Sequence, residues 1–363
     1  MADLRETINK LTASIKQMDE TNVRILDATM RVGPRNILDI GKSSGLPATT
    51  VYARFKRFRD FYGSLVSQNV MVSKLGLART GVFVKGERGK NGSLAEKLDS
   101  TGYLTANCVL NGSFDAYFQL ELPRNVVADF KRVVLDQFSK EDQKTEFVDL
   151  SDFVFQGKGY AFYEPLSAKW KFDWPRWVSD VLSLKEQSFG HTDGVVRFDS
   201  VDLYILKELQ LDGTTTYTSI ARKIGMTPQV IRKRYLRLSE LGVLGEYVYG
   251  VAPYPEELSE WLLVKMNFSN VALSHAFASA VTNMFWAKSY VPALTWDSAI
   301  LEAQILRGEE LGFMEFLESL VSKGVLSNYL VFREVPESRR RKTLPVDMFR
   351  NGEWCVDFRV LQK

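Results

Sequence analysis

The sequence contains very little histidine and cysteine, with two of each in 363 residues. No Cys/His pair falls at metal-ligand spacing, and Cys108 and Cys355 alone cannot build a disulfide framework. We therefore expect buried, inert thiols in a reducing, cytoplasmic compartment. The same scarcity predicts neither a metal nor a cofactor.

Long apolar runs and a strong charge of one sign are also absent. No apolar stretch approaches a membrane span, and the first residues lack the charged-then-apolar pattern of a signal peptide. The net charge is only +3, so affinity for nucleic acid has to come from local basic clusters. The sequence shows no Ser/His/Asp set, Cys/His set or phosphate-binding loop, so we expect no enzyme.

Residues 1–16 predict an amphipathic helix. Leu4, Ile8, Leu11 and Ile15 fall at i, i+4, i+7 and i+11, which is one stripe of a helix. Packing on its own domain is favoured over partner binding or dimerisation.

One stretch of about 40 residues occurs twice, 180 residues apart. Residues 19–26 superimpose on 199–206, and Gly45 falls on Gly225 without a gap. The same offset pairs Arg54 with Arg234 and Arg57 with Arg237. A repeat of this length is too long for a solenoid unit and indicates a set of domains duplicated in tandem.

Each copy predicts three helices with a glycine-centred turn. In the first copy, Asp19 is the expected N-cap of a helix to Met30, a short helix covers 36–43, and a third begins near Ala48. The second copy repeats this order with helices over 200–211, 217–224 and from Pro228. Three short helices in this order predict a helix-turn-helix.

The third helix of each copy combines an apolar stripe with a basic outer face, as expected of a helix that enters a DNA major groove. Its first residues would read base edges, and its arginines and lysines would bind phosphates. The reading positions differ between copies, so two different half-sites are expected, whereas the matched arginines indicate shared phosphate contacts. The candidates are Thr49, Thr50, Tyr52, Ala53, Arg54, Lys56, Arg57, Gln229, Arg232, Lys233, Arg234 and Arg237.

A β-α-β-β-α-β order follows each copy, which is the ferredoxin-like plan. Such a module forms an open antiparallel sheet with helices on one side, and its other face has to pack on something. The predicted fold class is α+β, with two winged-helix or helix-turn-helix domains, each followed by a ferredoxin-like domain. Predicted strands cover 78–85, 104–110, 114–121, 146–150, 261–268, 287–292, 298–306 and 328–334, after an extended stretch at 65–72; predicted helices cover 93–99, 123–138, 271–284 and 309–323.

Two further segments lie outside this plan. Residues 151–180 are rich in aromatic side chains, and Trp174 falls on Trp354 at the same offset. A structural strap is favoured over base stacking or a ligand cage. The run Arg339–Lys342 reads either as an arm on DNA phosphate or as a solvated loop.

These residues resemble the leucine-responsive regulator (Lrp/AsnC) family of bacteria and archaea, in a tandem-duplicated form of archaeal type. The resemblance lies in residues 19–58, in their second copy, and in the turn Asn111-Gly112-Ser113-Phe114-Asp115, similar to the family's Gly-x-Tyr/Phe-Asp turn between two module strands. It implies double-stranded DNA as partner and a small-molecule effector, such as an amino acid, near that turn. Gly112 and Asp115 are therefore effector-binding candidates, while the second turn, residues 294–297, has no glycine.

The family usually carries one copy per chain and dimerises through its sheets. Two copies therefore suggest an intrachain pseudo-dimer, or a homodimer that exchanges modules. The expected divisions are 1–16, helix-turn-helix 17–63, module 64–150, strap and linker 151–197, helix-turn-helix 198–243, module 244–335 and a C-terminal strap 336–363.

The predicted function is sequence-specific transcription regulation. A scaffold whose helix-turn-helices bind protein is the alternative. Siroheme decarboxylases also resemble tandem chains of this type, but their pattern has histidines around the corresponding hairpin, and residues 107–115 contain none.

Overall fold

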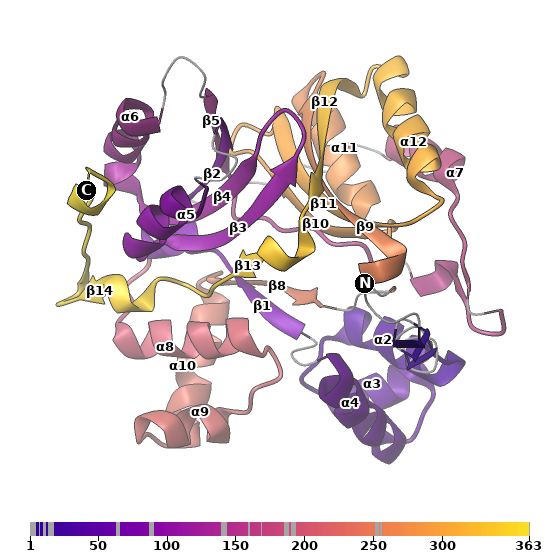
Figure 1. The fold of residues 1–363 in the computed structure, drawn as a ribbon. Coiled ribbons are helices and arrows are strands. Elements are labelled where there is room, and N and C mark those ends of the chain that lie inside the picture. The colour runs from indigo at the N-terminus through magenta and orange to yellow at the C-terminus, as the bar shows by residue number, and fades with distance from the viewer. Residues whose placement is uncertain are drawn as a thin grey trace.

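The structure is a computed structural model with an α+β fold (Figure 1). It describes residues 5–6, 8–9, 12–13, 18–62, 66–86, 91–138, 144–158, 160–167, 169–184, 189, 194–250, 254 and 256–362. The helix predicted over 1–16 falls mostly outside these residues. No helix within the described ranges is long and apolar enough to cross a membrane.

The first three-helix unit consists of α2 (Glu20–Val32), α3 (Ile37–Ser44) and α4 (Ala48–Tyr62). Asp19 caps α2, since its side chain accepts a hydrogen bond of 2.8 Å from the amide of Asn22. Gly45 ends α3 in the left-handed conformation, with φ of 67°. Both predicted helix boundaries are confirmed.

The second unit repeats this arrangement in α8 (Ser200–Leu211), α9 (Tyr217–Ile224) and α10 (Pro228–Glu240). Asp199 and Asp202 form a reciprocal capping box at the start of α8. Gly225 ends α9 with φ of 67°, the same value as Gly45. Pro228 occupies the first turn of α10, where a proline costs no hydrogen bond.

Two sheet modules follow these units in β-α-β-β-α-β order. Their strands run antiparallel in the orders β5-β2-β4-β3 and β12-β9-β11-β10, and β12 pairs with β3 to join both into one sheet. The first contains β2 (Leu77–Lys85), α5 (Asn91–Ser100), β3 (Leu104–Asn111), β4 (Ala116–Pro123), α6 (Val127–Phe138) and β5 (Lys144–Leu150). The second contains β9 (Ser259–Phe268), α11 (Val271–Val281), β10 (Ala287–Pro292), β11 (Ser298–Leu306), α12 (Glu310–Ser322) and β12 (Leu326–Glu334).

The sheet faces left bare by the helices pack on each other within the chain. Phe83 and Tyr117 of the first module meet Phe332 and Ile300 of the second in one buried cluster. The rings of Phe83 and Phe332 are 5.6 Å apart. This contact supplies the covering that an open sheet needs on its second face.

A two-stranded ribbon connects the two three-helix units. It pairs β1 (Val66–Val70) with β8 (Leu244–Tyr249), each of which follows the last helix of its unit. An extended stretch was expected at 65–72, where β1 lies, and no strand was expected at 244–249. The 180-residue offset was the available signal, because it places residue 66 on residue 246.

The segment after the first module crosses to the second module. Residues 150–158 run beside β10, where Phe155 and Tyr290 exchange backbone hydrogen bonds of 2.9 and 2.8 Å. Gly157 comes so close to the chain that an added Cβ would lie 1.8 Å from the carbonyl oxygen of Met284. The segment continues as α7 (Trp174–Ser183), which packs on α11 and α12.

The segment after the second module crosses to the first in the same way. The short strand β13 (Arg340–Arg341) pairs with β3, and α13 (Arg359–Gln362) packs on α5 and α6. Each strap therefore covers the helices of the other module. The remaining short elements are η1 (Val72–Leu75), η2 (Arg124–Val126), η3 (Tyr160–Phe162), β6 (Tyr163–Glu164), β7 (Lys169–Trp170), η4 (Glu256–Leu258), η5 (Pro336–Ser338), η6 (Val346–Met348), β14 (Phe349–Arg350) and β15 (Glu353–Trp354).

Two expectations about these segments are corrected. The run at 339–342 is not a loop, because residues 340–341 form β13 and pair with β3. Arg339 pairs with Glu302 and Glu334, and Lys342 pairs with Asp99, whereas Arg340 donates to backbone carbonyls. Contact of this run with DNA phosphate stays a prediction. Of the two free cysteines, Cys108 is buried as expected but Cys355 is exposed.

The aromatic strap behaves as core, which predicts a large stability cost for Trp177→Ala. Trp177 is fully buried against Phe162, Phe285 and Trp286. We expect the variant to lose about 3–5 kcal/mol of unfolding free energy in urea denaturation. Leu166, fully exposed in the same strap, is the matched control, and Leu166→Ala should change stability by less than about 0.5 kcal/mol. Equal stability of the two variants would contradict a core role.

Glu334 lies at the junction of β12 and β3, and we expect its carboxyl group to make the stability of the chain depend on pH. Burial and the neighbouring Glu302 raise its pKa to about 8, although the positive charge of Arg339 acts to lower it. Between pH 5 and 7 the folded chain therefore holds a proton that the unfolded chain releases, so stability falls as pH rises, by about 1 kcal/mol per pH unit. In thermal melts Glu334→Gln should flatten this decline, whereas Glu337→Gln, at an exposed site, should leave the wild-type slope.

Candidate nucleic-acid interface

The two candidate reading helices, α4 and α10, lie in units on the same side of the sheet modules (Figure 1). On α4, Tyr52 is 61% exposed. Side chains at the start of both helices face solvent, which leaves them accessible to a duplex. The exposed candidates are Thr49, Tyr52, Ala53, Lys56, Arg57, Gln229, Arg232 and Lys233; Thr50, Arg54, Arg234 and Arg237 are half-buried.

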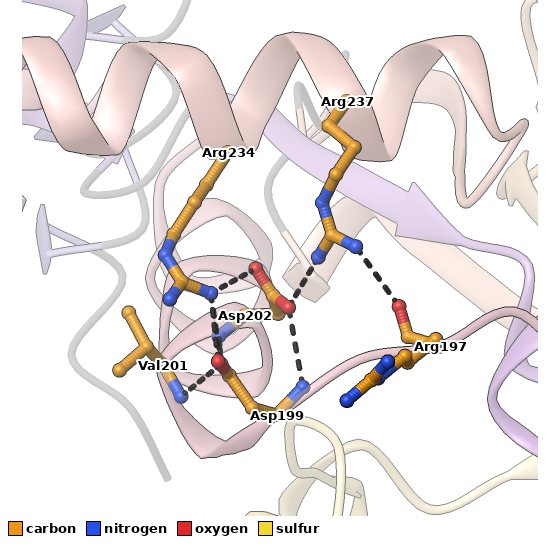
Figure 2. A network of polar contacts seen from close by, with 6 residues as sticks. All are labelled: Arg197, Asp199, Val201, Asp202, Arg234 and Arg237. Carbon is orange, nitrogen blue, oxygen red and sulfur yellow. Dashed lines mark hydrogen bonds and ion pairs between the residues drawn. The ribbon is translucent and has the colours of Figure 1, made fainter.

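Arg234 and Arg237 of α10 turn back to the N-terminus of α8 (Figure 2). Arg234 donates from Nη1 to Asp199 and Asp202, each at 2.9 Å. Arg237 pairs with Asp202 and donates to the carbonyl of Arg197 at 3.0 Å. Because only 1% of the Asp202 side chain is exposed, its charge depends on these two guanidinium groups.

The same contact lowers the pKa of the capping carboxylate. Burial disfavours the charged form of Asp199, but the amide of Asp202 and the Arg234 guanidinium outweigh it and lower the pKa below its ordinary value. The charged carboxylate then serves two purposes, since it caps α8 and ties α10 to it.

The first unit contains the equivalent ion pair. Arg54 of α4 pairs with Asp19, the N-cap of α2, and lies 3.4 Å from Asn22. Asn22 stands where the second unit has Asp202, so Arg57 lacks the carboxylate that binds Arg237. The match of Arg54 with Arg234 is thus explained by a repeated ion pair inside each unit, and it no longer indicates shared phosphate contacts. Contact of these arginines with DNA stays a prediction.

One arginine holds the two units together. Arg35, just before α3, donates to the backbone carbonyls of Gly213 and Thr215 in the other unit, both at 3.1 Å. Its guanidinium also lies over the rings of Tyr217 and Tyr235, 4.7 and 4.9 Å from their centres. Together with the β1–β8 ribbon, this contact fixes the position of α4 relative to α10.

The contact of Arg35 with the second unit was not predicted from the sequence. Arg35 lies 180 residues before Thr215, so it touches the residue that is its own counterpart in the repeat. The offset shows that such positions are equivalent, but it does not show that they meet. Meeting depends on how the two sheets pack.

The effector candidates lie in the turn between β3 and β4. The Asp115 side chain accepts a hydrogen bond of 2.8 Å from the amide of Gly86, and an added Cβ at Gly112 would lie 2.9 Å from the Phe332 ring. Both residues therefore shape the hairpin and its contact with the second module. Effector binding by these residues stays a prediction.

Comparison with known families gives a match on the second unit, where α8, α9 and most of α10 lie. Residues 198–239 match the AsnC-type helix-turn-helix domain. This AsnC-type unit contains Arg35's partners and all candidate residues of α10.

Two kinds of relatives are similar to the chain. An uncharacterised helix-turn-helix-type transcriptional regulator of Pyrococcus furiosus is 45% identical over 49 residues, which is 14% of this chain and 32% of that relative. The siroheme decarboxylase NirDL has a similar structure at 12% identity, with a TM-score of 0.53 over 88% of this chain and 92% of the other. NirDL in complex with an iron-uroporphyrin III analogue gives a TM-score of 0.52. At this identity the likeness shows a shared fold only.

The network in Figure 2 predicts that Arg234 stabilises the AsnC-type unit. Arg234→Ala should lower the unfolding free energy by about 1–3 kcal/mol, because it removes one of the two positive charges that offset the buried Asp202 carboxylate. Arg232→Ala, two residues away on the exposed face, should change it by less than about 0.5 kcal/mol. Thermal and urea unfolding measure both variants, and equal stabilities would show that the ion pairs add nothing.

Proposed function

We propose that this chain is a DNA-binding transcription regulator that places α4 and α10 in major grooves of one duplex. The observation that carries the proposal is the AsnC-type unit at 198–239, whose α10 exposes Gln229, Arg232 and Lys233. Exposed basic side chains of this kind would bind phosphates and give salt-dependent affinity. The regulator of Pyrococcus furiosus supports the same function over the 49 matched residues.

The two helices would read different sequences. Thr49 and Tyr52 of α4 occupy the positions equivalent to Gln229 and Arg232 of α10. An arginine side chain pairs well with guanine, and a glutamine side chain pairs well with adenine. A regulator with two unlike readers would select an asymmetric operator, in contrast to the palindrome of a symmetric dimer. The Arg35 contact and the ribbon would set the spacing of the two half-sites.

The alternatives have weaker support. A protein-binding scaffold would leave the exposed base-reading positions without a role. The fold shared with NirDL supports no reaction in this chain, and a visible absorption band in the purified protein is the observation that would favour one. Effector contact at Gly112 and Asp115 belongs to the proposal, with their hairpin contacts as the competing explanation.

The proposal predicts that Arg232→Ala with Lys233→Ala impairs DNA binding without unfolding the chain. Bound sequences are first selected from a random duplex library, and affinity is then measured by mobility shift. We expect at least a tenfold loss, because each exposed cation supplies phosphate or base contact worth about 1 kcal/mol or more. The salt dependence of binding should also become shallower by about one unit per lost phosphate contact.

Lys323→Ala is the matched control, since Lys323 is an exposed lysine at the end of α12, outside both three-helix units. It should bind the selected duplex like the wild type. Wild-type affinity in the Arg232/Lys233 double variant, with the fold intact, would refute the role of α10.

A further inference from the structure

The apolar packing between the two sheets does not fill the space between them. A cavity of about 800 Å³ lies beside it, with β3 and β4 on one side and β10 and β11 on the other. Residues 339–343 also line it, and it extends to the β1–β8 ribbon and the end of α8. The effector candidates Gly112 and Asp115 are not among its lining residues.

The lining of the cavity is rich in positive charge. It contains five cationic side chains, Arg79, Arg339, Arg340, Arg341 and Lys342, against three acidic ones, Glu121, Glu302 and Glu334. Burial and Glu302 raise the pKa of Glu334 to about 8, which reduces the negative charge of the lining near neutral pH. An anion entering this space would be attracted by the excess cations.

The cations differ in how they are already engaged. Arg79 is buried and pairs with Glu121 at 3.0 Å, so it forms part of the wall. Arg340 is exposed and donates to the backbone carbonyls of Glu337 and Arg339, at 2.8 and 3.1 Å. Among the described residues Arg340 makes no ion pair, so its guanidinium charge is available to an anionic group.

The opposite wall is suited to a carbon skeleton. Leu263, Val291 and Ile300 of the second module line it, and Tyr117 faces it from β4. Glu121 also lines the space, and its Oε2, which has no hydrogen-bond partner among the described residues, can accept a hydrogen bond from a hydroxyl group of a bound molecule. Charged groups on one side and apolar groups on the other fit a small organic molecule with acidic substituents.

We propose that this cavity binds a small multivalent anion, a polycarboxylate or an organic phosphate, that neutralises the 339–342 cluster. Ser67 and Val248 of the ribbon and Gln210 of α8 line the same space. An anion there would therefore touch the elements that hold the two reading helices in position, and its effect on DNA binding rests on the proposed function.

Isothermal titration of the full chain with citrate, and separately with inorganic phosphate, tests the site at constant ionic strength. We expect saturable binding of one anion per chain to at least one probe. Binding by citrate alone identifies a carboxylate site, and binding by phosphate alone identifies a phosphate site. Arg340→Gln with Lys342→Gln should weaken the binding at least tenfold, whereas Arg132→Gln, at an exposed arginine on α6, should not change it.

A second variant separates the cavity from general surface charge. Ser289→Phe fills the space and retains every charge, so it should abolish binding while the melting curve stays cooperative. Unchanged affinity in this variant, or in the Arg340/Lys342 double variant, would overturn the proposal, as would absent binding of both probes. The titration needs no DNA, so failure of the proposed function leaves its result unaffected.

Discussion

Burial of the two sheet faces against each other is the contact on which the rest of this chain depends. Each module covers one face of its sheet with helices. On the other face, Phe83 and Tyr117 of the first module pack against Ile300 and Phe332 of the second in one buried cluster. Once the sheets face each other, each strap reaches the opposite module and covers its helices. The three-helix units then lie side by side, and Arg35 spans from one to the other.

The two halves are similar in architecture and differ in chemistry. The capping aspartate and its arginine recur in both units, which explains why those positions match. Two differences stand out: Arg35, which contacts the other unit, has a threonine as its counterpart, and inside the first unit Asn22 stands in place of Asp202. The result is one molecule in which α4 and α10 present unlike side chains and are held in one relative position.

Much of this could be predicted from local sequence. Helix bounds follow from caps such as Asp19 and Gly45, and strand bounds follow from apolar runs, because both depend on neighbouring residues. The crossing of the straps could not be predicted, since α7 packs on α11 and α12, which lie at least 88 residues further along the chain. The ion pairs of Arg234 could not be predicted for the same reason, because an exposed basic face and an ion pair to a distant cap look alike in sequence.

The stoichiometry of the DNA complex, measured by sedimentation on duplexes carrying the selected half-sites, is the most direct test. We predict that a single chain binds one duplex with two different half-sites, and that replacing either half-site by a copy of the other weakens binding. Two chains on a symmetric palindrome, bound as tightly as the asymmetric duplex, would contradict it.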